Sequence, residues 1–447
     1  MPIATDARSN ADLHCDVAIV GGGAAGVATA VTAAKQGMQV VLVERHGFCG
    51  GGAVAGHSGT VCGLYEASEN PSNGPVQAVF GFTEKFIVAL NDRGGLGDPV
   101  RYGKTFTRVH DPIVWRETAD AFLADQNITT IYHAVATRVL SDVGERIEGV
   151  ELWTKQGPLR VRAKVTVDAS GDADLIAMAG LPNTIGDNGR VQNPTMIFRL
   201  MGVDVPAFLE AYGEDTIMPV EVSEQIVAAN ASGAYTLPRA KIWLFPTTRP
   251  NELLCNCTRV IGADGRELNP LFWRDFSAAE TEGRKQAREY ARFFADTLTG
   301  CENAFLNDMA VQVGVRQTRQ IDGVQTLQNA DILAGQKFGD GIARSPWPIE
   351  LHSGERPKVE WLLNDVYEIP YGCFVPERGE GLLAAGRCLS AEHEAVASAR
   401  VTAQCFSYGQ AIGHAASIAV HDNIAPRAIN GTDLRDVLNR DGARLNG

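Results

Sequence analysis

The residues with the clearest chemical role near the N-terminus are three glycines and one glutamate. Gly21, Gly23 and Gly26 have the spacing G-x-G-x-x-G, and Glu44 follows at the end of the next apolar run. In such a motif the first glycine makes a tight turn, the second lets a diphosphate approach the backbone, and the third lets a helix pack closely on a strand. A carboxylate at the position of Glu44 accepts hydrogen bonds from ribose hydroxyls. The pattern predicts a dinucleotide-binding site.

The elements on either side of the glycines fit this interpretation. Residues 16–20 are a run of apolar residues typical of a buried parallel strand, and residues 27–36 contain good helix formers. Residues 39–43 predict the next strand. Because the start of a helix offers free N–H donors and a positive dipole to phosphates, Ala24 and Ala25 are also expected to contact the dinucleotide.

A second glycine cluster after Glu44 distinguishes between two dinucleotides, FAD and NAD. Residues 45–53 read Arg-His-Gly-Phe-Cys-Gly-Gly-Gly-Ala. An NAD-dependent dehydrogenase usually continues at this point into its next crossover, whereas a glycine cluster lets the backbone run close to a longer and bulkier ligand. The cluster therefore favours FAD, with Arg45, Gly51 and Gly52 among its contacts.

Four further segments contain recognisable motifs, namely residues 167–174, 194–200, 314–323 and 382–390. Together with the N-terminal motif, these segments resemble the FAD-dependent oxidoreductase family of the glutathione-reductase-like flavoproteins, and the resemblance covers nearly the whole chain. The resemblance implies, in this order, a second FAD motif, the opening strand of a substrate domain, an arginine-rich motif near the active site, and a C-terminal flavin strand. It also implies further FAD contacts, which are Ala136, Ser170, Gly171, Gly386, Arg387, Arg400 and Val401.

The segment after residue 390 is also chemically reasonable as part of a flavin site. Residues 401–420 read as a long helix. In the family its N-terminus faces the flavin, where it would stabilise the negative charge that forms at the N1–C2=O edge on two-electron reduction. Arg387 and Arg400 would add to this effect or bind the diphosphate, and the alternative for both is a surface ion pair.

Four residues are candidates for the catalytic work. Because FAD accepts a hydride or single electrons at N5, the protein must place a substrate carbon nearby, hold developing charge and move a proton. His57 follows the second glycine cluster, and His393 lies in the loop between the flavin strand and the last helix. His352 belongs to a further segment that resembles the family, and Arg316 belongs to the arginine-rich motif. An arginine there would clamp a carboxylate or stabilise an enolate-like oxygen. For all four, the alternatives are interdomain ion pairs and satisfied core polar groups.

Two of the flavin-site expectations concern histidine and cysteine chemistry. Glu392 and Glu394 flank His393 and are expected to raise its pKa toward that of a useful base. FAD is expected to bind non-covalently. The alternative is a bond from Cys49 or His57 to the ring methyl, as in relatives within the wider superfamily.

Together these segments predict an α/β fold. A Rossmann-like FAD-binding domain with a parallel sheet is expected to be discontinuous in the sequence, over residues 13–190 and 361–425. Between these parts we expect an α+β substrate domain with a mostly antiparallel sheet over residues 191–360, and after them a polar tail over residues 426–447. Within the domains we expect helices over residues 76–91, 111–125, 278–298 and 401–420, and strands over residues 128–140, 147–153, 241–245, 252–260 and 381–385.

Composition and missing motifs exclude several classes of function. The formal net charge of −13 argues against nucleic acid as a partner. No apolar run of about 20 residues predicts a membrane span, and the N-terminus has the features of neither a signal nor a transit peptide. The nine cysteines look like reduced thiols, so a cytoplasmic location is expected. Cys255 and Cys257 read as packing residues without further ligands, so no metal is expected.

Missing redox motifs narrow the choice of reaction. Ala53 stands where disulfide reductases begin a C-x-x-x-x-C pair, and no second G-x-G-x-x-G lies between a strand and a helix. The leading prediction is a dehydrogenase or oxidase that removes a hydride equivalent from a small-molecule substrate and passes electrons to oxygen or another redox partner. The alternatives are a flavin reductase or monooxygenase reduced by NAD(P)H, and an FAD-containing binding or RNA-modifying factor. Assembly into a homo-oligomer is left open.

Overall fold

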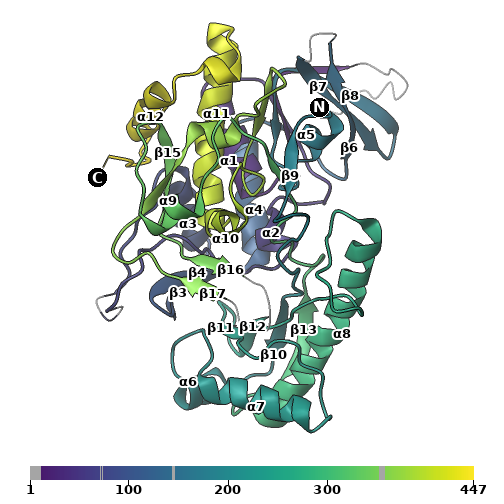
Figure 1. Cartoon of the computed structure of the whole chain (residues 1–447), viewed down its shortest axis with the longest axis vertical. Coiled ribbons are helices and arrows are strands. Elements are labelled where there is room, and N and C mark those ends of the chain that lie inside the picture. Colours follow the sequence, from purple (N-terminus) through teal and green to yellow (C-terminus); the bar gives the residue numbers. More distant parts are fainter. Residues whose placement is uncertain (1–11, 71, 73, 143–145, 352–357, 447) are drawn as a thin grey trace.

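A sheet of seven strands forms the centre of the first lobe, which occupies the upper part of Figure 1. The computed structural model describes residues 12–70, 72, 74–142, 146–351 and 358–446. The strand order is β5-β2-β1-β8-β7-β6, and β19 also pairs with β8. Its strands are β1 (Leu13–Val20), β2 (Val40–Val43), β5 (Thr129–Ile131), β6 (Val135–Ser141), β7 (Ile147–Thr154), β8 (Gly157–Asp168) and β19 (Leu382–Ala384).

The long strand β8 joins the two parts of this sheet. On one side β8 pairs with β1 in parallel, from Val161 to Asp168. On the other side its first half is antiparallel to β7 and its end is parallel to β19, where Ala384 lies opposite Asp168. Val20 of β1 lies opposite both Val43 and Asp168, so the parallel strands end at one common edge. This edge is where ligands bind in open α/β sheets.

The first and last long helices of the first lobe pack directly on each other. These are α1 (Ala24–Lys35) and α11 (Thr402–Asp422). A Cβ atom at Gly409 would lie 2.2 Å from the backbone oxygen of Ala25, and one at Gly413 would lie 2.8 Å from that of Thr29. The two glycines, one helical turn apart, therefore let α11 approach the backbone of α1. This contact brings the C-terminal part of the chain back to the N-terminal motif.

Shorter elements surround this core. The 3₁₀ helices are η2 (Tyr371–Phe374) and η3 (Pro426–Ala428). The α-helices are α2 (Gly51–Val54), α3 (Phe82–Asp92), α4 (Pro112–Asp125), α5 (Asp174–Met178), α9 (Asn329–Leu333), α10 (His393–Ala399) and α12 (Gly431–Arg440). Two-stranded pairs are formed by β3 (Leu96–Tyr102) with β4 (Thr105–His110), β9 (Asn183–Ile185) with β14 (Arg319–Ile321), β15 (Gly341–Ser345) with β18 (Tyr367–Pro370), and β16 (Ile349–Leu351) with β17 (Lys358–Glu360).

The second lobe, at the bottom of Figure 1, is an antiparallel sheet with helices and a core of its own. Helix α8 packs on β13 and buries Ala287, Tyr290 and Phe294, which recur at helical spacing. The sheet has the order β11-β12-β10-β13. Its elements are β10 (Phe198–Met201), β11 (Trp243–Pro246), β12 (Glu252–Asn256), β13 (Phe305–Met309), α6 (Val205–Tyr212), α7 (Val220–Ala231) and α8 (Trp273–Thr297).

The predicted α/β class is confirmed, with a mostly parallel sheet in one lobe and an antiparallel sheet in the other. The described residues contain no helix long and apolar enough to span a membrane. Strand β15 packs on α11, so the chain has returned to the first lobe by that point. Domain boundaries at residues 190, 360 and 425 stay predictions.

Several predicted elements need correction. The helix expected over residues 76–91 begins only at Phe82, because Gly81 has a φ of +71° and Gln77 forms a bridge with Tyr65. The strand expected over residues 128–140 is split into β5 and β6, since His133 has a φ of +54°. The strand expected over residues 252–260 ends at Asn256, and the helix expected over residues 278–298 begins earlier, as α8 over Trp273–Thr297. The polar tail contains α12, which buries two leucines.

Candidate cofactor and substrate site

A cavity of about 360 Å³ follows the common edge of the parallel strands and continues to the second lobe. At one end its wall is formed by residues that follow β1, β2 and β8, such as Gly21, Glu44 and Gly171. At the other end it reaches Phe245 of β11 and Asn256 of β12. One continuous space therefore connects the glycine motif of the first lobe with the sheet of the second.

The three glycines of the N-terminal motif have different surroundings. Gly21 has a φ of +110°, and a Cβ atom there would lie 2.2 Å from the oxygen of Ala169. A Cβ atom at Gly26 would lie 1.8 Å from the oxygen of Gly21. At Gly23, which lines the cavity, the nearest atom to a Cβ would be the Cα of Gly51 at 3.8 Å. Gly21 and Gly26 thus permit tight packing, whereas Gly23 leaves space for a ligand.

The carboxylate of Glu44 is held in place by the backbone. It is buried, and it accepts hydrogen bonds from the N–H of Gly22 at 2.7 Å and from the N–H of His46 at 2.8 Å. Carboxylate oxygens have further lone pairs, so Glu44 can accept additional bonds from a ligand. The bond to Gly22 ties its position to that of the glycine loop.

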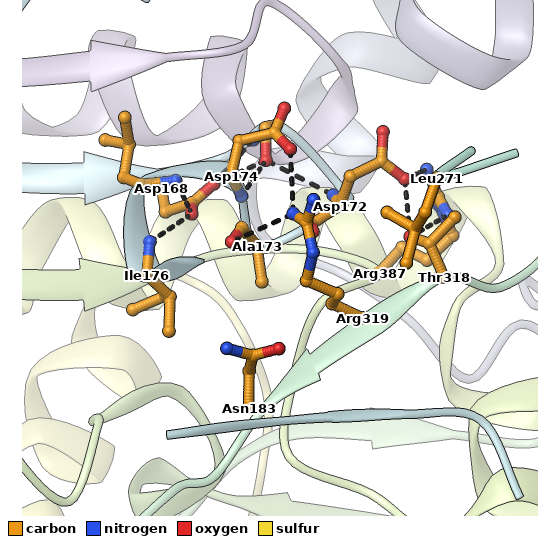
Figure 2. Close-up of polar contacts among 12 residues, drawn as sticks. Asp168, Asp172, Ala173, Asp174, Ile176, Asn183, Leu271, Thr318, Arg319 and Arg387 are labelled. Atoms are coloured by element: carbon orange, nitrogen blue, oxygen red, sulfur yellow. Dashed lines mark hydrogen bonds and ion pairs between the residues drawn. The ribbon is translucent and has the colours of Figure 1, made fainter. Parts of the chain in front are cut away.

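A network of polar contacts supports the loop after β8 (Figure 2). Asp168 accepts hydrogen bonds from the Ser170 hydroxyl at 2.6 Å and from the N–H of Leu175 at 2.8 Å. Burial raises the pKa of Asp168 to about 6, against the effect of these bonds. The result is a loop fixed at the edge where β8 ends, next to the cavity that Ser170 and Gly171 line.

Arg387 and two residues of the arginine-rich motif, Thr318 and Arg319, contribute to the same network. Arg387 forms an ion pair of 2.9 Å with Asp172, whose carboxylate also accepts a bond from Thr318 at 2.6 Å (Figure 2). Arg319 donates to the backbone oxygen of Asp172 at 2.8 Å and pairs with Asp174 at 3.0 Å. Arg319 therefore supports the loop after β8, whereas Arg316, three residues earlier, lines the cavity.

Two helix N-termini meet the cavity. Ala24 and Ala25 begin α1, and Val401 and Thr402 begin α11, and all four line the cavity. Ser58 Oγ and Arg400 Nε are buried there without a hydrogen-bond partner among the described residues. N–H donors, helix dipoles and unsatisfied polar atoms along an open glycine loop fit a ligand that carries a diphosphate at one end and polar ring edges at the other.

Most of the residues predicted to contact FAD lie together on this cavity. Gly26 is the exception, because it packs α1 against the turn at Gly21. The remaining predicted contacts that line the cavity are Gly21, Gly23, Ala24, Ala25, Glu44, Arg45, Gly51, Gly52, Ala136, Ser170, Gly171, Gly386, Arg387, Arg400 and Val401.

The predicted catalytic residues are not brought together in the same way. Arg316 lines the cavity, whereas His57 and His393 do not, and His352 lies outside the described residues. His57 is buried with Nε2 3.7 Å from Asp308, and burial lowers its pKa to about 4. Cys49 is also buried and does not line the cavity.

The expected rise in the pKa of His393 is wrong. Burial lowers the pKa of this histidine, although Asp187 and Glu394 act in the opposite direction. The two flanking carboxylates bind other groups. Glu392 accepts a hydrogen bond from the N–H of Asn329 at 2.7 Å, and Glu394 lies 3.7 Å from Lys358.

Several side chains at the second-lobe end of the cavity were not predicted from the sequence to belong to the site. The Tyr102 hydroxyl donates to Glu350 Oε1 at 2.6 Å, and both residues are buried and line the cavity. The walls beside them include Trp347, whose ring centroid is 5.2 Å from that of Tyr102. Cys62 and Cys405 also line the cavity. The available signal was Glu350 itself, a charged residue in the apolar segment 347–351.

Comparisons with known proteins agree with the geometry. The sequence profile described as FAD dependent oxidoreductase matches residues 16–438. The fold is similar to that of a geranylgeranyl bacteriochlorophyll reductase-like protein from Thermoplasma acidophilum, with 14% identity, a TM-score of 0.51, and coverage of 97% of this chain and 85% of that chain. A glycine oxidase from Geobacillus kaustophilus has 14% identity and a TM-score of 0.46, with 92% of this chain and 95% of that chain covered. No curated protein sequence matches significantly.

The family match extends over both lobes, from β1 to α12, and therefore includes every segment that lines the cavity. The predicted cofactor, FAD, and the predicted class of enzyme are confirmed by this match. The chain belongs to the FAD-dependent oxidoreductase family.

Proposed function

We propose that the protein is a dehydrogenase or oxidase that removes a hydride equivalent from a small organic substrate bound at the second-lobe end of the cavity. The observation that carries this proposal is the continuity of the cavity, which places the Tyr102–Glu350 pair at the far end from the glycine loop. FAD, held without a covalent link in this proposal, would supply a two-electron acceptor at its flavin N5, and oxygen or another redox partner would take up the electrons.

The residues around the glycine loop hold the cofactor in this proposal. N–H groups at the start of α1 would bind the diphosphate, and Glu44 would bind the ribose. At the other end, the N-terminus of α11 and Arg400 would hold the polar edge of the ring and favour negative charge there. Because α11 has 21 residues, its dipole is fully developed at Thr402.

The Tyr102–Glu350 pair moves the proton that accompanies hydride removal. A hydride that leaves a carbon next to oxygen or nitrogen also requires loss of a proton from that heteroatom. Burial and the neighbouring Glu350 raise the pKa of Tyr102 well above its ordinary value, so its hydroxyl stays protonated and donates. Glu350 is the residue that accepts the substrate proton, and Tyr102 fixes its orientation through the bond of 2.6 Å.

Anaerobic reduction of the bound flavin tests the proposed function. Mixing the FAD-loaded protein with a panel of small alcohols, amines and acids should bleach the flavin for at least one class of substrate. Glu350→Gln should slow this reduction about 100- to 10,000-fold, the usual contribution of a general base, with unchanged FAD content. Rapid bleaching by NADPH or NADH without substrate would contradict the proposal and support a reductase or monooxygenase.

A further inference from the structure

Arg316 is buried on the wall of the cavity without a carboxylate beside it. Its Nη1 donates to the backbone oxygen of Asn193 at 2.7 Å, and its Nη2 donates to Asn256 Oδ1 at 3.4 Å. Among the described residues, no Asp or Glu oxygen lies within 4 Å of its guanidinium. A guanidinium has five N–H donors, so Arg316 retains donors for a ligand. A buried cation without a counter-charge is costly, and a bound anion removes that cost.

The surroundings of Arg316 are positively charged. Arg239 is buried nearby and donates to the same Asn256 Oδ1 at 3.4 Å. Arg400 lines the cavity and donates to Gln192 at 3.3 Å. Burial, followed by the charges of Arg239 and Arg400, lowers the pKa of Arg316 well below its ordinary value, and Glu350 and Tyr102 offset this only in part. A further anion beside Arg316 would therefore stabilise its cationic form.

The charges at this end of the cavity favour a negatively charged group on the ligand. Arg316 and Arg400 line the cavity, Arg239 is buried nearby, and Glu350 is the acidic residue lining this end among the described residues. Arg316 keeps donors beyond its bonds to Asn193 and Asn256. The planar fork of arginine matches a carboxylate with two parallel bonds.

The remainder of the wall determines the uncharged part of the ligand. Tyr102, Phe245 and Trp347 also line the cavity and provide flat apolar surfaces. Trp347 and Tyr102 are in ring contact, with centroids 5.2 Å apart. Such walls favour an aromatic or branched apolar group, because they remove its surface from water.

From this arrangement we infer that the substrate is a carboxylate with an apolar, aromatic-sized group, and that Arg316 binds its carboxylate. That this ligand is the substrate rests on the proposed function, whereas binding of the carboxylate by Arg316 can be measured without turnover. It assigns Arg316 to recognition of the substrate rather than to the diphosphate of FAD. Arg316 is then the residue that selects acids over uncharged analogues.

Ligand binding to the oxidised, FAD-loaded protein tests this inference. Phenylacetate and its uncharged analogue phenylacetamide are titrated separately while the visible flavin band is recorded, with inorganic phosphate as a third probe. Phenylacetate should perturb the band and bind at least tenfold more tightly than the amide. Arg316→Gln should weaken phenylacetate binding about ten- to a hundredfold, the loss usual for a bond to a charged group, and leave the amide and the FAD content unchanged.

Matched variants complete the experiment. Arg288→Gln removes the same charge from an exposed position of α8 and should bind phenylacetate like the wild type. Arg316→Lys keeps the charge but loses the fork geometry, so its affinity should fall between those of the wild type and Arg316→Gln, and it serves as the test variant if the glutamine variant does not fold. Equal affinity of the wild type for acid and amide, tighter binding of phosphate than of phenylacetate, or loss of FAD from the Arg316 variants would overturn the inference. Selective acid binding without flavin reduction by any acid would instead refute only the proposed function.

Discussion

Lowering the pH from 7 to 5 should destabilise the protein through two buried histidines near the junction of the lobes. Burial lowers the pKa of His57 to about 4, and the nearby Asp308 offsets this only in part. Burial and the charge of Arg199 lower the pKa of His110 to about 3. The unfolded chain binds protons at these positions with a pKa of about 6.5, whereas the folded chain does not. Stability is therefore highest above pH 6.5 and is lost as the pH falls toward 4.

The size of this loss follows from the pKa values. A pH of 5 is about 1.5 units below the pKa of each histidine in the unfolded chain, so each histidine destabilises the folded state by roughly 2 kcal/mol. Asp168 acts in the opposite direction, because its pKa is raised to about 6 and it takes up a proton in the folded state. This uptake stabilises the folded state by about 1 kcal/mol at pH 5. The three groups together should therefore lower the free energy of unfolding by about 3 kcal/mol.

Urea unfolding at pH 7 and pH 5, followed by tryptophan fluorescence at a fixed excess of FAD, measures the effect. His57→Asn is suitable because asparagine tolerates the φ of +48° at this position and does not titrate. The variant should lose about 2 kcal/mol less than the wild type between the two pH values. His14→Asn, at an exposed position of β1, should behave like the wild type. Identical pH dependence in wild type and His57→Asn would refute the reasoning, since it would mean that His57 takes up its proton in the folded state.

Three further substitutions test the cofactor end of the cavity. Glu44→Gln should weaken FAD binding about ten- to a hundredfold in a flavin titration, because the ribose loses a charged acceptor. Gly26→Ala should lower the free energy of unfolding by about 3 kcal/mol or prevent folding, since its Cβ would lie 1.8 Å from a backbone oxygen, whereas Gly339→Ala, with open space around it, should not. Arg387→Met should destabilise the protein by about 3 kcal/mol by leaving the Asp172 carboxylate without its ion pair, and adding Asp172→Asn should restore part of that loss in chemical denaturation.

The cofactor end of the site could be predicted from the sequence because its chemistry depends on neighbouring residues. The turn at Gly21, the space at Gly23 and the packing at Gly26 all follow from one short segment. Glu44 comes at the end of the next strand, so the pairing of the two strands brings it beside that segment. A motif of this kind predicts its own three-dimensional arrangement, because the residues involved are close together in the sequence.

The second-lobe end of the cavity, which is the proposed substrate end, could not be predicted in this way. Tyr102, Asn256 and Glu350 lie on strands β3, β12 and β16, and only the packing of the lobes brings them to one wall. Burial also shifts the pKa values of side chains, and the sequence does not show which side chains are buried. The flanking carboxylates suggested a basic His393, but burial has the larger effect on its pKa. Arg316 was predicted, whereas its distance from any carboxylate depends on the fold.

The two ends of the cavity differ in what fixes their shape. The cofactor end is formed largely by backbone and by residues without long side chains, so a substitution there displaces main chain and affects the fold together with FAD binding. The substrate end is formed by long side chains such as Arg316, Tyr102 and Trp347, which can change without moving the glycine loop. Substrate preference can therefore diverge while the cofactor site is retained, as expected when function depends on the site rather than on the fold. For this reason the family match establishes FAD as the cofactor, whereas the buried guanidinium of Arg316 bears on the proposed substrate.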